Sequence, residues 1–179
     1  MNMVQEILIE QIGRVLKNKI RLEKELQVQI THKGKLVFVE GDAEKEYLAL
    51  KVLEAIDLGF EIDKSLLLKN EEIILQVLNI KDITKRNDLE RVRARIIGTH
   101  GKTIENMERL SNCEICLHDN DIGIIGDCEI IKEAIISLKS LVQGSKQSNV
   151  YARLEKKKKE RRLKPVENIK NEFKHRKRK

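Results

Sequence analysis

The chain repeats itself at a spacing of 85 residues, and this repeat limits the folds open to it more than any other feature. The segment "VEGDAEKEYLALKVLEAIDLG" (39–59) returns as "IIGDCEIIKEAIISLKSLVQG" (124–144). The matching pairs are Gly41 with Gly126, Asp42 with Asp127, and Gly59 with Gly144. Each copy predicts a strand, a corner and a helix, with the aspartate as N-cap and the last glycine as C-cap. We therefore predict two related units in one chain.

Each unit is predicted to be α+β, with the element order β-α-α-β-β-α. In the second unit, hydrophobic spacing predicts a strand in 71–80, helices in 88–97 and 102–110, strands in 114–118 and 121–125, and a helix in 127–143. The first unit has matching strands in 26–30 and 35–39, and only residues 1–4 are left for its opening strand. Each unit should therefore form a three-stranded antiparallel sheet packed against helices.

Charge is divided unevenly along the chain. Residues 151–179 hold 14 Lys and Arg against 4 Glu, a net charge of +10, which leaves −3 for residues 1–150. A basic tail of this kind is typical of proteins that bind a polyanion such as nucleic acid, although it also suits a solvated helix. We expect this tail to be helical to about Leu163 and to be interrupted at Pro165. Aromatic residues make up only 3% of the chain, which argues against an RNA-recognition motif that stacks bases on aromatic side chains.

The stretch "RIIGTHGKT" (95–103) ends like a nucleotide-binding P-loop, in Gly101-Lys102-Thr103. A P-loop needs another glycine five residues before Gly101, a strand before the loop and a helix after it. That earlier position is Ile96, and the preceding segment has helical spacing. An NTPase that uses residues 98–103 is therefore the least favoured function.

The same stretch fits a G-x-x-G loop between two helices. Glycines at Gly98 and Gly101 would let the backbone turn tightly and approach a phosphodiester, and the free N–H groups that open the next helix favour phosphate oxygens. This arrangement is the RNA clamp of a type I KH domain. The predicted RNA-binding residues are Gly98, Thr99, His100, Gly101 and Lys102 in the loop, Arg91, Arg93 and Arg95 before it, and Ile96, Ile97, Ile104 and Ile115 as an aliphatic floor.

Several of these side chains have a second interpretation. Lys102 also suits an ordinary surface lysine. The three arginines cannot all face one way on a helix that turns about 100° per residue, so some would instead pair with Glu90 or Glu108. At least two of the four isoleucines suit the core better than a groove.

The first unit carries a degenerate version of the loop. Ile12-Gly13 matches Ile97-Gly98, but Leu16 stands where the second glycine would be, with Arg14 and Val15 between. A leucine there would block the approach of a phosphate. This comparison predicts that the first unit serves as a scaffold or as a site for protein docking.

Catalytic and metal-binding patterns are weak. Cys113-x2-Cys116 with His118 and Cys128 invites a zinc site, but side chains three apart on a strand point to opposite faces, so buried reduced cysteines are the better interpretation. We expect no enzyme activity, no metal and no cofactor. An odd number of cysteines, no signal peptide and no apolar run of membrane-spanning length indicate a cytoplasmic protein.

Three segments carry more than a generic KH pattern. They are "RVRARIIGTHGKTIENMERLSNCEI" (91–115), "EAIDLGFEIDKSLLL" (54–68) and "GSKQSNVYARLEKKKK" (144–159). With them the chain resembles the archaeal ribosome-assembly proteins that have two KH domains, which are related to eukaryotic small-subunit pre-rRNA processing factors. It departs from that family at Gln147-Ser148, where a His-Gly pair usually stands.

The resemblance implies a division into a degenerate KH domain (1–69), a KH domain with an intact G-x-x-G loop (70–144) and a basic C-terminal extension (145–179). It also implies binding to single-stranded rRNA near the 3′ end of the 16S rRNA in the pre-small-subunit ribosome. Partners implied in the same way are the processing endonuclease and the alpha subunit of translation initiation factor 2. A KH-type subunit of another machine, such as the exosome or a transcription or translation regulator, remains the alternative.

Overall fold

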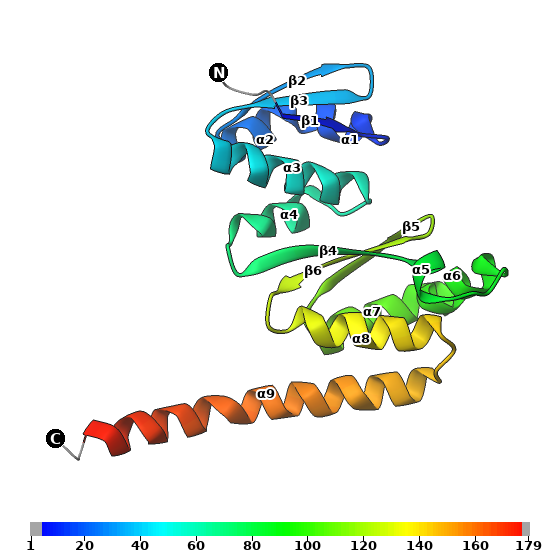
Figure 1. The fold of residues 1–179 in the computed structure, drawn as a ribbon, viewed down its shortest axis with the longest axis vertical. Helices are drawn as coiled ribbons and strands as arrows, with labels where there is room; N and C mark the ends of the chain where they lie inside the picture. The colour runs from blue at the N-terminus through cyan, green and yellow to red at the C-terminus, as the bar shows by residue number, and fades with distance from the viewer. Residues whose placement is uncertain (1–4, 177–179) are drawn as a thin grey trace.

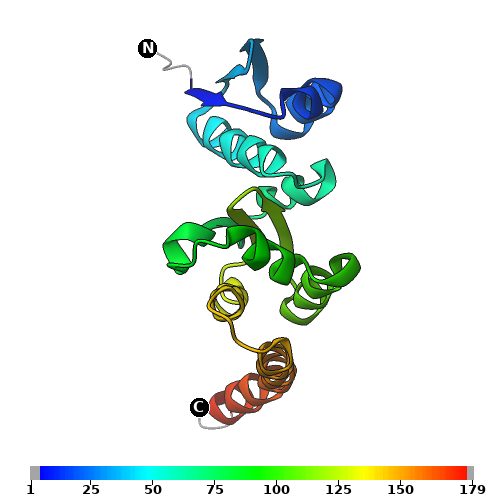
Figure 2. The ribbon, with the colours of Figure 1, turned by 90° about the vertical axis from the view of Figure 1, so that its right-hand side faces the viewer.

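The computed structural model describes the backbone of residues 5–176 and the side chains of residues 5–163. Sheets and helices alternate in layers along the long axis of the molecule, as Figures 1 and 2 show from two sides. A sheet near the N-terminus is followed by helices, a second sheet, further helices and one long final helix. The two predicted three-stranded sheets are both present, and every strand pairing is antiparallel.

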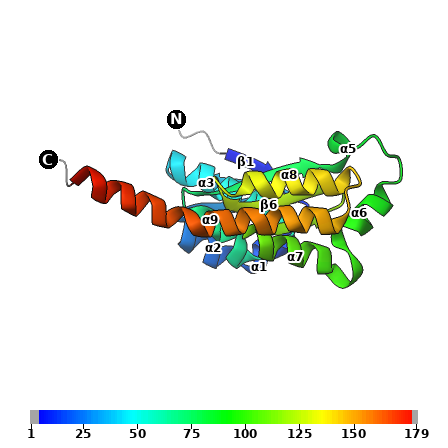
Figure 3. The same cartoon turned by 90° about the horizontal axis from the view of Figure 1, so that it is seen from below.

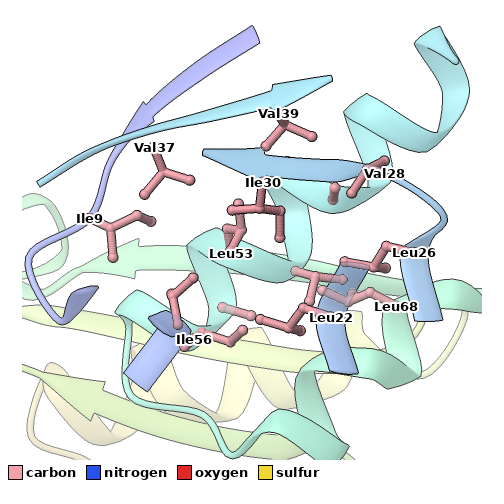
Figure 4. Packing of buried hydrophobic residues seen from close by; sticks show 14 of the residues in the cluster. Ile9, Leu22, Leu26, Val28, Ile30, Val37, Val39, Leu53, Ile56 and Leu68 are labelled. Atoms are coloured by element: carbon pink, nitrogen blue, oxygen red, sulfur yellow. The ribbon is translucent and has the colours of Figure 1, made fainter. Parts of the chain in front are cut away.

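The first sheet has the strand order β1-β3-β2. Its strands are β1 (Gln5–Leu8), β2 (Gln29–Lys33) and β3 (Leu36–Glu40), and its helices are α1 (Ile12–Lys17), α2 (Lys19–Leu26) and α3 (Ala43–Asp57). Alternate residues of β3, Val37 and Val39, point inward with Ile30 of β2 and pack on Leu53 and Ile56 of α3 (Figure 4). The helices therefore cover one face of this sheet.

The second sheet has the matching order β4-β6-β5. Its elements are β4 (Ile73–Asn79), α5 (Ile80–Ile83), α6 (Leu89–Ile97), the 3-10 turn η2 (Thr99–Gly101), α7 (Lys102–Ser111), β5 (Glu114–His118), β6 (Asp121–Asp127) and α8 (Ile131–Val142). The strands β5 and β6 begin 85 residues after β2 and β3, so the repeat in the sequence is a repeat in the fold. Both units are α+β.

The central strand β6 is buried on both faces. The helices of its own unit cover one face, and the segment after α3 covers the other, including α4 (Ile62–Ser65) and the 3-10 turn η1 (Leu66–Lys69). Phe60 packs on Gly123, and the Cys116 thiol donates to the Leu58 carbonyl oxygen over 3.2 Å. Ile125 of β6 belongs to the hydrophobic core of the first unit. The two units therefore share an apolar contact along this strand.

Two predicted elements begin too early. The strand predicted in 26–30 begins at Gln29, because Leu26 still belongs to α2 and Gln27 ends that helix in a left-handed conformation. The helix predicted in 127–143 begins at Ile131. Asp127 instead ends β6, and its carboxylate accepts the Glu129 N–H at 2.8 Å in a turn that separates strand from helix. Asp42 does occupy the N-cap position of α3, but its carboxylate pairs with Lys45 at 3.0 Å. The opening strand occupies Gln5–Leu8; the predicted residues 1–4 lie outside the described part of the chain.

The final helix, α9 (Gln147–Arg176), runs past the predicted end at Leu163. Pro165 lacks an N–H and so leaves one helical hydrogen bond unmade, but good helix formers such as Lys, Arg and Glu flank it on both sides. Seen from below, α9 lies beside α8 (Figure 3), and it also contacts α7. Among the helices described, none combines the length and apolar character needed to cross a bilayer.

Candidate nucleic-acid interface

The predicted G-x-x-G loop lies between α6 and α7. Val92 and Ile96 bury one face of α6 in the core of the second unit, and Met107 and Leu110 do the same for α7. A helix, not a strand, therefore precedes the loop, as a KH domain requires and a P-loop forbids. The Gly98 N–H donates to the Ala94 carbonyl oxygen at 2.8 Å and closes α6.

Both loop glycines occupy backbone conformations that favour glycine, for different reasons. Gly98 has φ +73°, and a Cβ on it would lie 2.0 Å from Thr103 Oγ1 and 2.9 Å from the Thr103 nitrogen. Gly101 has φ +77°, and a Cβ there would meet nothing within 4 Å. Internal packing therefore requires Gly98, whereas the backbone at Gly101 borders open space that a ligand could enter.

The tip of the loop is a single tight turn. The Gly101 N–H donates to the Gly98 carbonyl oxygen at 3.2 Å, and His100 sits in the left-handed region at φ +53°. Thr99, His100 and Lys102 are all exposed. The turn leads directly into α7, so the free N–H groups of the first helical turn and the positive end of the helix dipole lie next to Gly101.

The three predicted arginines point in different directions. Arg93 donates to the Asn120 side chain at 2.9 Å, and Arg95 donates to the backbone carbonyls of Gly144, at 2.8 Å, and Ser145. The Arg91 side chain is 82% exposed, with Nη1 4.0 Å from an Asp88 carboxylate oxygen. The predicted pairing of these arginines with Glu90 or Glu108 is wrong, because the arginines contact other acceptors. Arg91 is therefore the arginine of the three that faces solvent.

Asp88 is held more closely by another arginine. The Arg86 guanidinium donates two hydrogen bonds of 2.8 Å to the Asp88 carboxylate and lowers the pKa of that carboxyl to about 2. Asp88 is therefore ionised and paired at neutral pH. The longer contact from Arg91 leaves its guanidinium exposed for an external anion.

The four predicted isoleucines divide into two pairs. Ile96 and Ile115 are buried in the core of the second unit, as the packing interpretation predicted. Ile104 lies at the edge of that core, and Ile97 is 41% exposed. Of the predicted aliphatic floor, only Ile97 and Ile104 present surface next to the loop.

A contact behind the loop had no signal in the sequence. Thr103, in the first turn of α7, is buried, and its hydroxyl accepts a hydrogen bond from the Gln147 side-chain amide at 3.0 Å. Gln147 is the first residue of α9 and lies 44 positions away in the chain. Local sequence patterns do not connect residues this far apart. The sequence showed that Gln147 differs from the residue usual in the family, but it did not show which side chain Gln147 contacts.

The predicted degenerate loop of the first unit is not a loop. Residues 12–17 form the helix α1, in which Val15 is fully buried, and α1 meets α2 at Asn18. The Arg14 side chain donates to the carbonyl oxygens of Phe60, at 2.9 Å, and Ile56, at 3.3 Å. Without a second glycine, this stretch continues as helix, and these contacts fix it against the end of α3 and the segment that follows.

The cysteines are dispersed. Cys113 is buried, Cys116 is half-buried, and Cys128 is exposed, so the prediction of burial was wrong for Cys128. Burial raises the pKa of the Cys113 and Cys116 thiols. Within residues 5–163, no three His, Cys, Asp or Glu side chains gather in a way that could hold a metal ion.

Comparison with known proteins assigns the second unit to a domain family. Residues 74–159 match the eukaryotic-type KH domain, KH-domain type I. The chain is 29% identical to a KH domain-containing protein of Methanocaldococcus jannaschii, over 84% of this chain and 68% of that protein. It is 30% identical to the RNA-binding protein PNO1 of Oryzias latipes, over 73% of this chain and 57% of that protein. The chain thus spans little more than half of this second relative.

Solved structures extend the likeness to both units. The crystal structure of Dim2p from Pyrococcus horikoshii superposes with a TM-score of 0.80 at 27% identity, covering 87% of this chain and 99% of that one. A second structure, of an a/eIF2alpha–aDim2p–rRNA complex from the same organism, gives a TM-score of 0.79 at 28% identity, covering 88% and 95%. Residues 74–159 therefore belong to the type I KH-domain family, and the chain is PNO1/Dim2-like over most of its length.

Proposed function

We propose that the protein is a non-enzymatic RNA-binding factor in small-subunit ribosome assembly, and that it holds single-stranded rRNA with the loop at residues 98–101. The observation that carries this proposal is the geometry of Gly101. Its backbone borders open space at the start of α7, where a phosphate could approach the free N–H groups without meeting a side chain.

Charge and apolar surface around Gly101 support the same proposal. Lys102 and Arg91 are exposed and supply positive charge on either side of the loop. Ile97 and Ile104 offer aliphatic surface on which a base could rest. A KH domain binds about four nucleotides in this way, with the backbone clamped by the loop and the bases in a groove.

The relatives support rRNA as the target. One similar structure is described as a complex of a/eIF2alpha, aDim2p and rRNA, and a relative from Saccharomyces cerevisiae is named a pre-rRNA-processing protein. We extend this to binding near the 3′ end of the 16S rRNA in the pre-small-subunit ribosome. We also propose the alpha subunit of initiation factor 2 and the processing endonuclease as partners, with this protein as an adaptor in the cytoplasm.

The first unit completes the proposal as a second KH domain that lacks the loop. Its strand order, β1-β3-β2, corresponds to β4-β6-β5, but a short helix replaces the clamp. We therefore propose a KH-derived docking unit in residues 1–69, the RNA-binding KH domain in 70–144 and a basic extension in 145–179.

The test compares Gly101→Asp with Leu16→Asp in the full chain. The substitution at Gly101 places a carboxylate at the proposed phosphate position, and aspartate tolerates the left-handed backbone better than most residues. We expect it to weaken binding to a labelled single-stranded oligonucleotide from the 3′ end of 16S rRNA by about tenfold or more, measured by fluorescence anisotropy. Leu16→Asp, at the matching position of the first unit, should bind within about twofold of the wild type.

Two results would count against the proposal. Normal binding by a folded Gly101→Asp protein would show that the loop is not the clamp. Equal binding of the 3′-end oligonucleotide and one with a scrambled sequence would remove the specific rRNA target, and crosslinking to rRNA followed by sequencing would then locate the true one.

A further inference from the structure

Helix α9 is packed into the second unit at its N-terminal half. Val150 and Leu154 are buried in the same hydrophobic core as α7 and α8. Farther along α9, Lys157 pairs with Glu133 of α8 at 3.8 Å, and the Lys158 ammonium donates to the Arg109 carbonyl oxygen near the end of α7. This part of the extension is therefore integrated into the folded domain.

The turn that leads into α9 is tied to both flanks of the G-x-x-G loop. Arg95, in the last turn of α6, donates to the carbonyl oxygens of Gly144 and Ser145. Gln147, two residues farther on, donates to Thr103 in the first turn of α7. One flank precedes Gly98 and the other follows Gly101, so the α8–α9 turn links the two ends of the loop.

The Gln147 contact reaches the loop backbone through one side chain. The Thr103 hydroxyl that accepts this hydrogen bond lies where a Cβ of Gly98 would be, with 2.0 Å between the two positions. The oriented Thr103 side chain thus fills the space beside Gly98. Because Thr103 is buried, its hydroxyl would lose its side-chain partner if Gln147 could not donate.

We infer that Gln147 and Arg95 are positioning residues of the RNA clamp, and that docking of α9 holds the loop in its RNA-binding conformation. The inference rests on the proposed function of the loop. It gives the first turn of α9 a role that does not depend on its charge. It also assigns Arg95 to the support of the loop and leaves Arg91 to face the RNA.

The first test changes Gln147 without changing charge. Gln147→Leu removes the donor, Thr103→Val removes the acceptor, and Gln143→Leu serves as the control at an exposed glutamine four residues earlier. We expect Gln147→Leu and Thr103→Val each to weaken binding of the 3′-end oligonucleotide about threefold to tenfold, because fewer molecules hold the competent loop. The double variant should lose no more affinity than the single variant that binds RNA less tightly.

Two further readouts separate positioning from simple destabilisation. Hydrogen exchange of the Gly101 amide, which bonds to the Gly98 carbonyl oxygen, should be faster in both variants and unchanged in the control. The dependence of affinity on salt concentration should keep the wild-type slope, because no phosphate contact is removed.

The second test compares Arg95→Gln with Arg91→Gln. Loss of a phosphate contact should lower the salt slope by about one, whereas loss of the tie to Gly144 and Ser145 should weaken binding at an unchanged slope. We expect the first result for Arg91 and the second for Arg95. A reduced slope for Arg95→Gln would make it an RNA contact and overturn its assignment as a positioning residue.

The outcomes also separate this inference from the proposed function. If Gly101→Asp weakens binding but Gln147→Leu behaves like Gln143→Leu, the clamp stands and the inference is wrong. Additive losses in the double variant would likewise overturn it, because the two side chains would then act independently. If Gly101→Asp itself binds RNA normally, the result contradicts the proposed clamp, on which this inference rests.

Discussion

Phe60 lies directly against Gly123, so that a Cβ on the glycine would be 2.6 Å from the phenylalanine ring. Phe60 follows α3 of the first unit, and Gly123 lies in the central strand of the second sheet. The contact explains why a glycine occupies the middle of a strand, where it would otherwise weaken the sheet.

Gly123→Ala should therefore destabilise the protein. The added methyl group would force the Phe60 ring or β6 to move, at a cost of about 1–3 kcal/mol in the free energy of unfolding, measured by urea titration. Gly13→Ala is the matched control, because a Cβ there meets nothing within 4 Å and Gly13 lies in helix α1. It should stabilise the protein by up to about 1 kcal/mol, and an equal loss in both variants would contradict the packing explanation.

The two loop glycines should respond differently to alanine. Gly98→Ala combines an unfavourable backbone conformation with a collision against Thr103, and we expect a loss of about 2–5 kcal/mol in stability. Gly101→Ala carries only the conformational strain, roughly 1–2 kcal/mol. Thermal and urea unfolding of the two variants would measure the difference. Equal losses would mean that Thr103 yields to the methyl group, and that the contact beside Gly98 is soft.

Glu108 should make stability depend on pH in an unusual direction. Its carboxylate accepts the Ile115 N–H at 2.9 Å, but partial burial raises its pKa above the ordinary 4.5. The folded state therefore binds this proton more tightly than the unfolded state. The contribution of Glu108 to stability is greatest below pH 4.5 and is lost as the pH rises through the raised pKa.

Glu108→Gln isolates this effect, because glutamine keeps the oxygen that accepts the Ile115 N–H and does not titrate. The stability of the wild type minus that of Glu108→Gln should fall as the pH rises from below 4.5, as measured by urea unfolding over a pH series. A difference that rises with pH would show that the hydrogen bond outweighs burial at this carboxyl.

Thiol reactivity should distinguish the three cysteines. Cys128 is exposed, whereas burial raises the pKa of Cys113 and Cys116 and lowers their fraction of reactive thiolate. At neutral pH, a thiol reagent should modify Cys128 rapidly and the other two slowly, and Cys128→Ser should remove the rapid phase. Rapid modification of Cys116 would indicate that the contact between the two units opens.

The sequence predicted those features that local patterns or the repeat could carry. Hydrophobic spacing placed α6, α7 and the strands β5 and β6, and the offset of 85 residues located the strands β2 and β3 of the first unit to within three residues. The two glycines of the loop were recognised from their spacing alone. These elements depend on residues close together in the chain, so their signals survive without tertiary context.

The errors arose where distant contacts decide the structure. The first unit has only Ile9–Asn18 between β1 and α2, which leaves no room for both a helix and a clamp loop, so residues 12–17 became α1. The contacts of Arg95 were missed because its acceptors, Gly144 and Ser145, lie 49 and 50 positions away. Sequence periodicity shows which face of a helix is polar, but not which acceptor each polar group finds.

Burial of β6 between two helical layers has a mechanical consequence. Ile125 belongs to the core of the first unit, and Ile122 and Ile124 belong to the core of the second. A hinge motion between the units would therefore have to open an apolar contact along this strand. The molecule should therefore behave as a rigid spacer. A protein held by the first unit would be kept at a fixed distance and orientation from an RNA strand held at Gly101.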